Sequence, residues 1–140
     1  MQAEDRDVEL SREAIRHTMS IYNNAGDRGD LDGFVSAFAP DGVLEVYGRQ
    51  YQGADEIRAF AASAGEGRRA SKAIGRKTYV RHHTTTSRIE IAGPDAALGW
   101  TYFIIFSDAA APRTGLYVDS FSRREGKWLI AKRRVKMDGE

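Results

Sequence analysis

The stretch that determines the fold is AALGWTYFIIFS at residues 96–107, followed by TGLYVDSFSR at 114–123. Both runs are rich in aromatic and β-branched residues and are bounded by turn-forming residues, which is typical of β-strands. Two further strands and two turns complete this half of the chain: strands at 79–92 and 128–137, turns at 93–95 and 124–126. The C-terminal half is therefore predicted to be an antiparallel meander.

The N-terminal half has the periodicity of helices. From Asp7 to about Ala25 apolar residues recur at helical spacing, and Gly26 is expected to end the helix. The other expected elements are a short helix capped by Asp30, a strand at 43–47 that turns back through 48–49, a helix from Asp55 to about Ala64, and a mobile loop at 65–77 over a pocket mouth. Helices followed by a long antiparallel meander indicate an α+β fold.

Composition excludes several functions. The 140 residues contain no cysteine, so thiolate nucleophiles, disulfides and cysteine metal sites are ruled out for this chain. The net charge is +1, and strand alternation divides the basic cluster at 132–136 between two faces, so nucleic-acid binding is not expected. The acidic N-terminal residues and the lack of a long apolar run lead us to expect a cytoplasmic protein with no membrane span.

The histidine pair at 82–83 poses a question of strand parity. In a regular strand Ile89 and Ile91 share a face with His83, whereas His82 points to the other side. One extra residue in a bulge would bring His82 to the face of the isoleucines, and without it His83 would point to the core. Because neighbouring strand residues alternate faces, the two histidines are not expected to bind one metal ion.

Several short segments resemble, in order, those of the SnoaL-like family of the nuclear transport factor 2-like superfamily. They are YNNAGDRGD at 22–30, FAPDGV at 38–43, GADEI at 53–57, RHH at 81–83, GLYVD at 115–119, and GKW at 126–128 with Arg133. The resemblance implies one domain over residues 1–140 with a cystatin-like cone. In that fold, N-terminal helices pack in the concave face of a curved, mostly antiparallel sheet around an internal pocket.

Within this superfamily the chain is most similar to the branch of scytalone dehydratase, bile-acid dehydratase and hexachlorocyclohexane dehydrochlorinase. The resemblance implies a histidine base at His82, its aspartate partner at Asp27 and a pocket arginine at Arg133. Tyr22 is similar to a pocket tyrosine of the bile-acid enzyme. The chain departs from that enzyme at 104–105, where two isoleucines stand about where a pocket acid is expected.

These residues suit proton abstraction from carbon. A histidine is the usual general base near neutral pH, and a carboxylate on its other ring nitrogen fixes the tautomer. His82 would take the proton while Asp27 orients it, and Tyr22 and Arg133 would stabilise developing negative charge. The predicted function is a lyase or isomerase that acts on a small hydrophobic cyclic compound and needs neither a metal nor an organic cofactor.

Other interpretations remain open from the sequence. Asp27 beside two glycines could instead bond turn amides, and Arg133 could be an ordinary surface residue. A SnoaL-type polyketide cyclase and a non-catalytic binding protein are alternative functions.

The expected substrate-binding residues are Trp100, Tyr102, Tyr117 and Asp119. Family members usually pair through the outer face of the sheet, so the resemblance also implies a homo-oligomer, a dimer or trimer.

Overall fold

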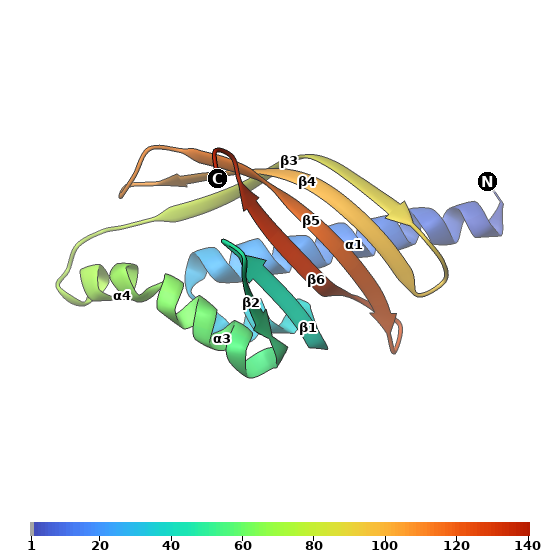
Figure 1. The fold of residues 1–140 in the computed structure, drawn as a ribbon, viewed down its shortest axis with the longest axis horizontal. Helices are drawn as coiled ribbons and strands as arrows, with labels where there is room; N and C mark the ends of the chain where they lie inside the picture. Colours follow the sequence, from blue (N-terminus) through green and yellow to red (C-terminus); the bar gives the residue numbers. More distant parts are fainter. Residues whose placement is uncertain (1) are drawn as a thin grey trace.

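The computed structural model describes residues 2–140, and Met1 lies outside the described residues. Its elements are α1 (Ala3–Arg28), α2 (Leu31–Ser36), β1 (Phe38–Val46), β2 (Arg49–Gln52), α3 (Gly53–Ala64), α4 (Glu66–Ala73), β3 (Val80–Ile91), β4 (Ala96–Ser107), β5 (Arg113–Arg124) and β6 (Lys127–Met137). The strands form one sheet in the order β2-β1-β6-β5-β4-β3. Helices pack against the concave side of this curved sheet, which confirms the predicted α+β cystatin-like fold (Figure 1).

Helix α1 is longer than the sequence predicts at both ends. It ends at Arg28 because Gly29 adopts a left-handed conformation with φ 73°, whereas Gly26 stays helical. The helix buries one face against the sheet, including Ile15, Met19 and Tyr22. Its last turn therefore reaches far enough to carry Asp27 to the sheet.

The sheet is mixed rather than purely antiparallel. The meander β3-β4-β5-β6 is antiparallel throughout, as predicted, and β1 then pairs in parallel with β6. The short hairpin of β1 and β2 forms the far edge. This parallel pairing brings Leu44 of β1 beside Arg133 of β6, in the middle of the concave face.

Two bulges decide which side chains face inward. On β3 the register shifts between Thr84 and Ser87, where one extra residue stands opposite β4. Of the two alternatives that the sequence leaves open, the structure has the bulge, which places His82 on the same face as Ile89. The second bulge, which the sequence did not indicate, lies on β6 opposite Ser120 and Phe121 and turns Arg133 inward.

The expected mobile loop at 65–77 is wrong over most of its length. Residues Glu66–Ala73 form the helix α4, which follows α3 at one end of the molecule (Figure 1). None of its residues is buried. Because the helix has no buried stripe, the sequence carries no apolar periodicity there, and Gly67 weakens the helical signal further.

None of the helices within 2–140 is long and apolar enough to cross a membrane.

We predict that Gly115→Ala destabilises the sheet, because there is no room for a side chain at this position of β5. A β-carbon at this position would overlap the Phe103 ring and the Lys136 carbonyl oxygen. The free energy of unfolding in urea should fall by about 1–3 kcal/mol. Gly67→Ala in α4 is the matched control, because its new carbon meets no atom within 4 Å. Equal stability of the two variants would contradict this packing.

Candidate functional site

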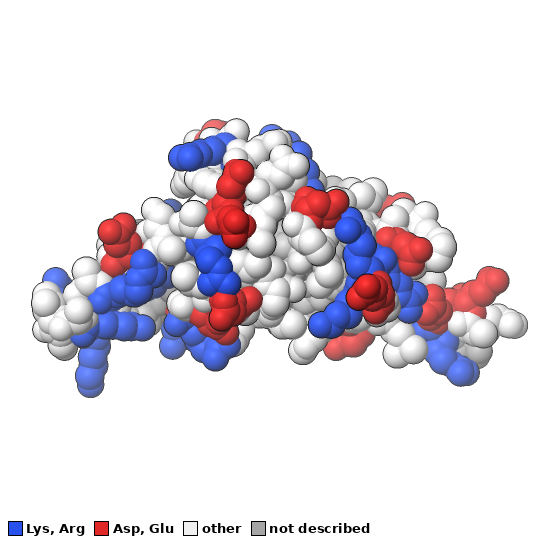
Figure 2. All heavy atoms as spheres, turned by 90° about the horizontal axis from the view of Figure 1, so that it is seen from below, with Lys and Arg blue, Asp and Glu red and all other residues white. Residues whose placement is uncertain are grey.

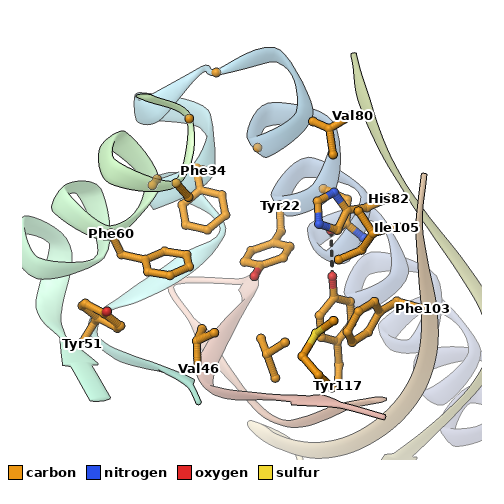
Figure 3. Close-up of a pocket in the computed structure, with 18 of the residues that line it drawn as sticks. Tyr22, Phe34, Val46, Tyr51, Phe60, Val80, His82, Phe103, Ile105 and Tyr117 are labelled. Carbon is orange, nitrogen blue, oxygen red and sulfur yellow. Dashed lines mark hydrogen bonds between the residues drawn. The ribbon is translucent and has the colours of Figure 1, made fainter. Parts of the chain in front are cut away.

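A cavity of about 590 Å³ lies between the concave face of the sheet and the helices. Its wall is mostly apolar, and aromatic rings from α1, α2, α3 and the sheet surround it (Figure 3). The residues labelled in that view are Tyr22, Phe34, Val46, Tyr51, Phe60, Val80, His82, Phe103, Ile105 and Tyr117. A concave apolar site with few polar groups is typical of small-molecule binding.

His82 lies in this wall and is held by Asp27. The Nδ1 atom of His82 is 2.6 Å from Oδ1 of Asp27, and the backbone N–H of His82 donates to Oδ2 at 2.9 Å. One carboxylate thus fixes both the ring and the backbone of the same residue. The side chains are largely covered, with 26% of His82 and 11% of Asp27 exposed.

The contact determines how His82 can act. An ionised carboxylate only accepts hydrogen bonds, so Nδ1 carries the proton and donates it to Asp27. In the neutral ring, Nε2 is then the unprotonated nitrogen. His82 therefore has the tautomer that a general base requires, with its ring in the wall of an apolar cavity.

The competing interpretations of these two residues do not hold. His83 is exposed and packs edge-on against Phe106, with ring centroids 5.2 Å apart. The helix-capping carboxylate is that of Asp30, which accepts from the Gly33 N–H at 2.9 Å. Asp27 instead bonds to His82, so its position near the end of α1 serves a contact across the fold.

Behind the cavity wall lies a buried ion pair. Arg133 donates from Nε and Nη2 to the two carboxylate oxygens of Asp119, at 2.8 and 2.9 Å, and both side chains are fully buried. The guanidinium stacks against the rings of Tyr22 and Tyr117, with 4.3 and 3.9 Å from Cζ to the ring centroids. Its Nη1 has no hydrogen-bond partner within residues 2–140.

The charges of this pair follow from its surroundings. Burial acts to lower the pKa of Arg133, but the Asp119 carboxylate outweighs it and holds that pKa above its ordinary value. Burial also raises the pKa of Asp119, against the attraction of Arg133. A guanidinium with a bidentate carboxylate partner forms a stable ion pair, so Arg133 stays protonated next to the two tyrosine rings.

Both tyrosines keep their phenolic protons. Burial raises the pKa of Tyr22, and it raises that of Tyr117 well above the ordinary value. The Tyr117 hydroxyl donates to Oδ1 of Asn23 at 3.1 Å, the contact drawn as a dashed line in Figure 3. A protonated phenol is a hydrogen-bond donor, so Tyr22 can offer its hydrogen to a ligand oxygen in the cavity.

Comparison with known proteins agrees with this architecture. The model of the SnoaL-like domain matches residues 8–134. The chain belongs to this family. A search of curated protein sequences finds no significant match.

Solved structures similar to this SnoaL-like domain share its fold. A protein of unknown function from Mycobacterium tuberculosis is 25% identical, with a TM-score of 0.79, over 99% of this chain and 77% of that chain. The hexachlorocyclohexane dehydrochlorinase of Novosphingobium barchaimii is 20% identical, with a TM-score of 0.80, over 96% and 90%. A putative scytalone dehydratase of Novosphingobium aromaticivorans is 15% identical, with a TM-score of 0.78, over 95% and 87%.

Three of the four expected substrate-binding residues of this SnoaL-like domain do not line the cavity. Trp100 and Tyr102 point to the outer face of β4, because the inward positions on that strand are the odd-numbered ones such as Thr101. Asp119 faces inward, but it is buried behind the wall in its pair with Arg133. Tyr117 does line the cavity, as expected.

Arg133 requires a correction as well. The expectation that it contacts the substrate is not met, because its side chain is 0% exposed and is not part of the cavity wall. The second bulge and the Asp119 contact, neither visible in the sequence, account for this burial. Ile105 lines the cavity at about the position where the resemblance to the bile-acid enzyme implies an acid, whereas Ile104 points outward.

Sequence reasoning missed four polar residues of the cavity wall. They are Asn23, Arg49, Arg68 and Arg113. Asn23 follows Tyr22 directly and could have been suspected from its place on the buried side of α1. The arginines come from three separate elements, and only the register of the strands and the position of α4 bring them to one cavity. Within residues 2–140, no three His, Asp or Glu side chains are grouped to hold a metal ion.

We predict that breaking the buried ion pair destabilises the protein far more than breaking an exposed one. Asp119→Asn leaves the Arg133 charge without its counter-charge, and the free energy of unfolding should fall by about 3–5 kcal/mol. Asp41→Asn is the matched control, since Asp41 makes an exposed pair with Arg124 at 2.9 Å, and its loss should cost less than about 1 kcal/mol. Urea denaturation measures both, and similar losses would refute the buried-pair assignment.

Proposed function

We propose that this SnoaL-like domain is a cofactor-independent lyase or isomerase that removes a proton from carbon in a small, mostly apolar cyclic compound. The observation that carries the proposal is the hydrogen bond between His82 and Asp27 at the wall of an apolar cavity. Such a pair provides a neutral imidazole base whose protonated form is stabilised by the carboxylate.

In the proposed reaction, Nε2 of His82 takes a proton from a carbon next to a carbonyl or a leaving group. The electron pair of the broken C–H bond forms a new C=C bond. In an elimination the leaving group departs with its own electron pair. In an isomerisation the electrons first move to the carbonyl oxygen, and the His82 imidazolium then returns the proton to a different carbon.

Tyr22 and Arg133 stabilise the negative charge that develops in this step. Tyr22 donates its phenolic hydrogen to the oxygen or leaving group, because its raised pKa keeps the phenol protonated. Arg133 does not touch the substrate and serves as a positioning residue. Its guanidinium stacks against the rings of Tyr22 and Tyr117 and so fixes the position of the Tyr22 phenol in the cavity wall.

The names of two structures with this fold support an elimination. One is called a hexachlorocyclohexane dehydrochlorinase and the other a putative scytalone dehydratase. Dehydrochlorination and dehydration both remove a proton from carbon and a group from its neighbour. We carry over this class of chemistry, and not the substrates, because the two chains are only 20% and 15% identical to this one.

The rival functions fit the cavity less well. A cyclase of the SnoaL type would use a free carboxylate as its acid and base, but no Asp or Glu is among the residues that line the cavity. Asp27 is already bonded to His82. A purely binding protein does not need an oriented imidazole, and here the cavity is open rather than filled by its own aromatic side chains.

We predict that His82→Ala strongly slows proton exchange at carbon. Wild-type protein should exchange solvent deuterium into one or more members of a panel of cyclic ketones and hydroxy-ketones, followed by NMR. His82→Ala should slow exchange by about 10²- to 10⁴-fold, the usual contribution of a general base. His83→Ala is the matched control and should exchange at the wild-type rate, since His83 lies on the other face.

Two results would contradict the catalytic role. Binding of the panel without exchange by the wild type would favour a binding protein. Exchange that survives in His82→Ala would place the base elsewhere. Asp27→Asn should retain the cavity and the imidazole but lose the carboxylate, so its exchange rate should lie between those of wild type and His82→Ala.

We also propose that the chain forms a homo-oligomer, a dimer or trimer, through the outer face of the sheet. This face carries large apolar side chains along β4, with Leu98 41%, Tyr102 56% and Phe106 39% exposed. Trp100 and Ile104 lie on the same side. An apolar surface of this kind on a sheet is commonly covered by a partner.

We predict that charges on this face produce monomers. Light scattering of the wild type should give the mass of two or three chains. The double variant Leu98→Glu with Tyr102→Glu should give the mass of one, because two desolvated carboxylates oppose burial of the face. Ser36→Glu is the control, because Ser36 is an exposed residue of α2 away from the sheet face, and it should leave the assembly intact. A wild type that is monomeric at all concentrations would exclude the proposal.

A further inference from the structure

The cavity has an uncompensated positive charge. Its wall contains three arginines, Arg49, Arg68 and Arg113, and no aspartate or glutamate. Within residues 2–140 none of the three has a carboxylate oxygen within 4 Å. Eight other arginines do form ion pairs with Asp or Glu, at positions 12, 28, 58, 88, 123, 124, 133 and 134. Half of the sixteen arginines are therefore paired with an acid, and none of these eight lies in the cavity wall.

The three charges lie toward the opening and the apolar groups lie deeper. Arg49 and Arg113 are exposed and Arg68 is half-buried, whereas the wall residues Phe103 and Tyr117 are each 1% exposed. Each arginine comes from a different element, namely β2, α4 and β5. Figure 2 shows Lys and Arg side chains gathered at the end of the molecule where α4 lies. The cavity thus presents an apolar interior and a cationic mouth.

Strand register places one of these charges at a defined separation from the proposed base. His82 of β3 pairs with Ile105 of β4, and Ile105 pairs with Arg113 of β5. All three residues line the cavity. Two strand spacings separate the Cα atoms of His82 and Arg113 by roughly 10 Å. A ring system in the cavity can therefore reach the base at one end and the guanidinium at the other.

We infer that the molecule bound in this cavity is an apolar ring system with an anionic oxygen group, such as a carboxylate, held at the mouth by Arg49, Arg68 and Arg113. The inference rests on the proposed function for its reaction and adds the class of substrate. Guanidinium groups bind carboxylate and related oxyanions through paired N–H donors, and unpaired cations around a low-dielectric opening attract such ligands.

The test compares two fluorescent probes that share one ring system. 1-Anilinonaphthalene-8-sulfonate carries an anionic group, and N-phenyl-1-naphthylamine lacks it. Wild-type protein should bind the sulfonate at least about tenfold more tightly than the uncharged amine, and added salt should reduce this difference in affinity. Methyl 1-naphthoate should displace the sulfonate less effectively than 1-naphthoate, which carries the free carboxylate.

Variants then locate the charge preference. Arg49→Gln, Arg68→Gln and Arg113→Gln should each weaken sulfonate binding about two- to fivefold, the range for partly exposed ion pairs, and the triple variant about tenfold or more. Binding of the uncharged probe should stay within twofold. Arg16→Gln, exposed on α1 and outside the cavity wall, removes the same charge and should have no effect. Ala61→Trp narrows the cavity and should weaken both probes.

The outcomes separate this inference from the proposed function. Equal affinity for the two probes, the same loss in Arg16→Gln as in Arg113→Gln, or sulfonate binding that Ala61→Trp does not weaken would overturn the inference. His82→Ala should still prefer the sulfonate over the uncharged probe, because Arg49, Arg68 and Arg113 remain in the cavity wall. If the wild type binds both probes equally but still shows exchange that depends on His82, the inferred substrate class is wrong and the proposed reaction stands. If the wild type prefers the sulfonate but shows no exchange that depends on His82, the proposed reaction is wrong and the substrate class stands.

Discussion

The contact between α1 and the edge strand β3 determines the geometry of the site. Asp27 accepts the backbone N–H and the ring N–H of His82, and Arg12 donates to the Ile89 carbonyl oxygen at 3.2 Å. The two anchor points are 15 residues apart on the helix, roughly 22 Å, and seven apart on the strand, roughly 23 Å. Because these two lengths match, α1 can hydrogen-bond backbone groups of β3 at both points. These groups belong to the edge of the sheet, where a strand of another chain could otherwise pair.

Positive charge is balanced by a carboxylate behind the inner wall of the cavity, but it is not balanced at the cavity mouth. Inside, the positive charge of Arg133 is matched by Asp119 and covered by two tyrosine rings, so it contributes a fixed field with no free ligand site. At the mouth, three arginines have no acidic partner among the described residues and remain available to a ligand. Between them lies His82, whose only titratable neighbour by hydrogen bond in residues 2–140 is Asp27. The arrangement suits a ligand that is apolar in its middle and anionic at one end.

Most of the fold could be predicted from the sequence because its signals are local. Helical spacing located α1, and turn residues delimited the four strands of the meander to within a few residues. Strand parity left open whether His82 or His83 shares a face with Ile89, and only the register of β3 against β4 decides for His82. Helix α4 was missed because none of its residues is buried, so no apolar stripe marks it.

The site was only partly predictable because much of it depends on distant pairings. The His82 and Asp27 pair followed from a family resemblance, and the structure brings their atoms together. Arg133 was expected at the substrate, but a bulge opposite Ser120 and a partner on β5 bury it. The position of Arg113 in line with His82 depends on the register of three strands, which no single stretch of sequence encodes.

The proposed reaction requires that Asp27 holds His82 as a base whose Nε2 is free. A long-range ¹H–¹⁵N correlation spectrum of labelled protein, recorded where the imidazoles are neutral, reports which ring nitrogen of each of the three histidines carries the proton. We expect His82 to be protonated on Nδ1 and Asp27→Asn to alter this state, while His17 and His83 are unchanged by the substitution. A wild-type His82 protonated on Nε2, or a spectrum insensitive to Asp27→Asn, would contradict it.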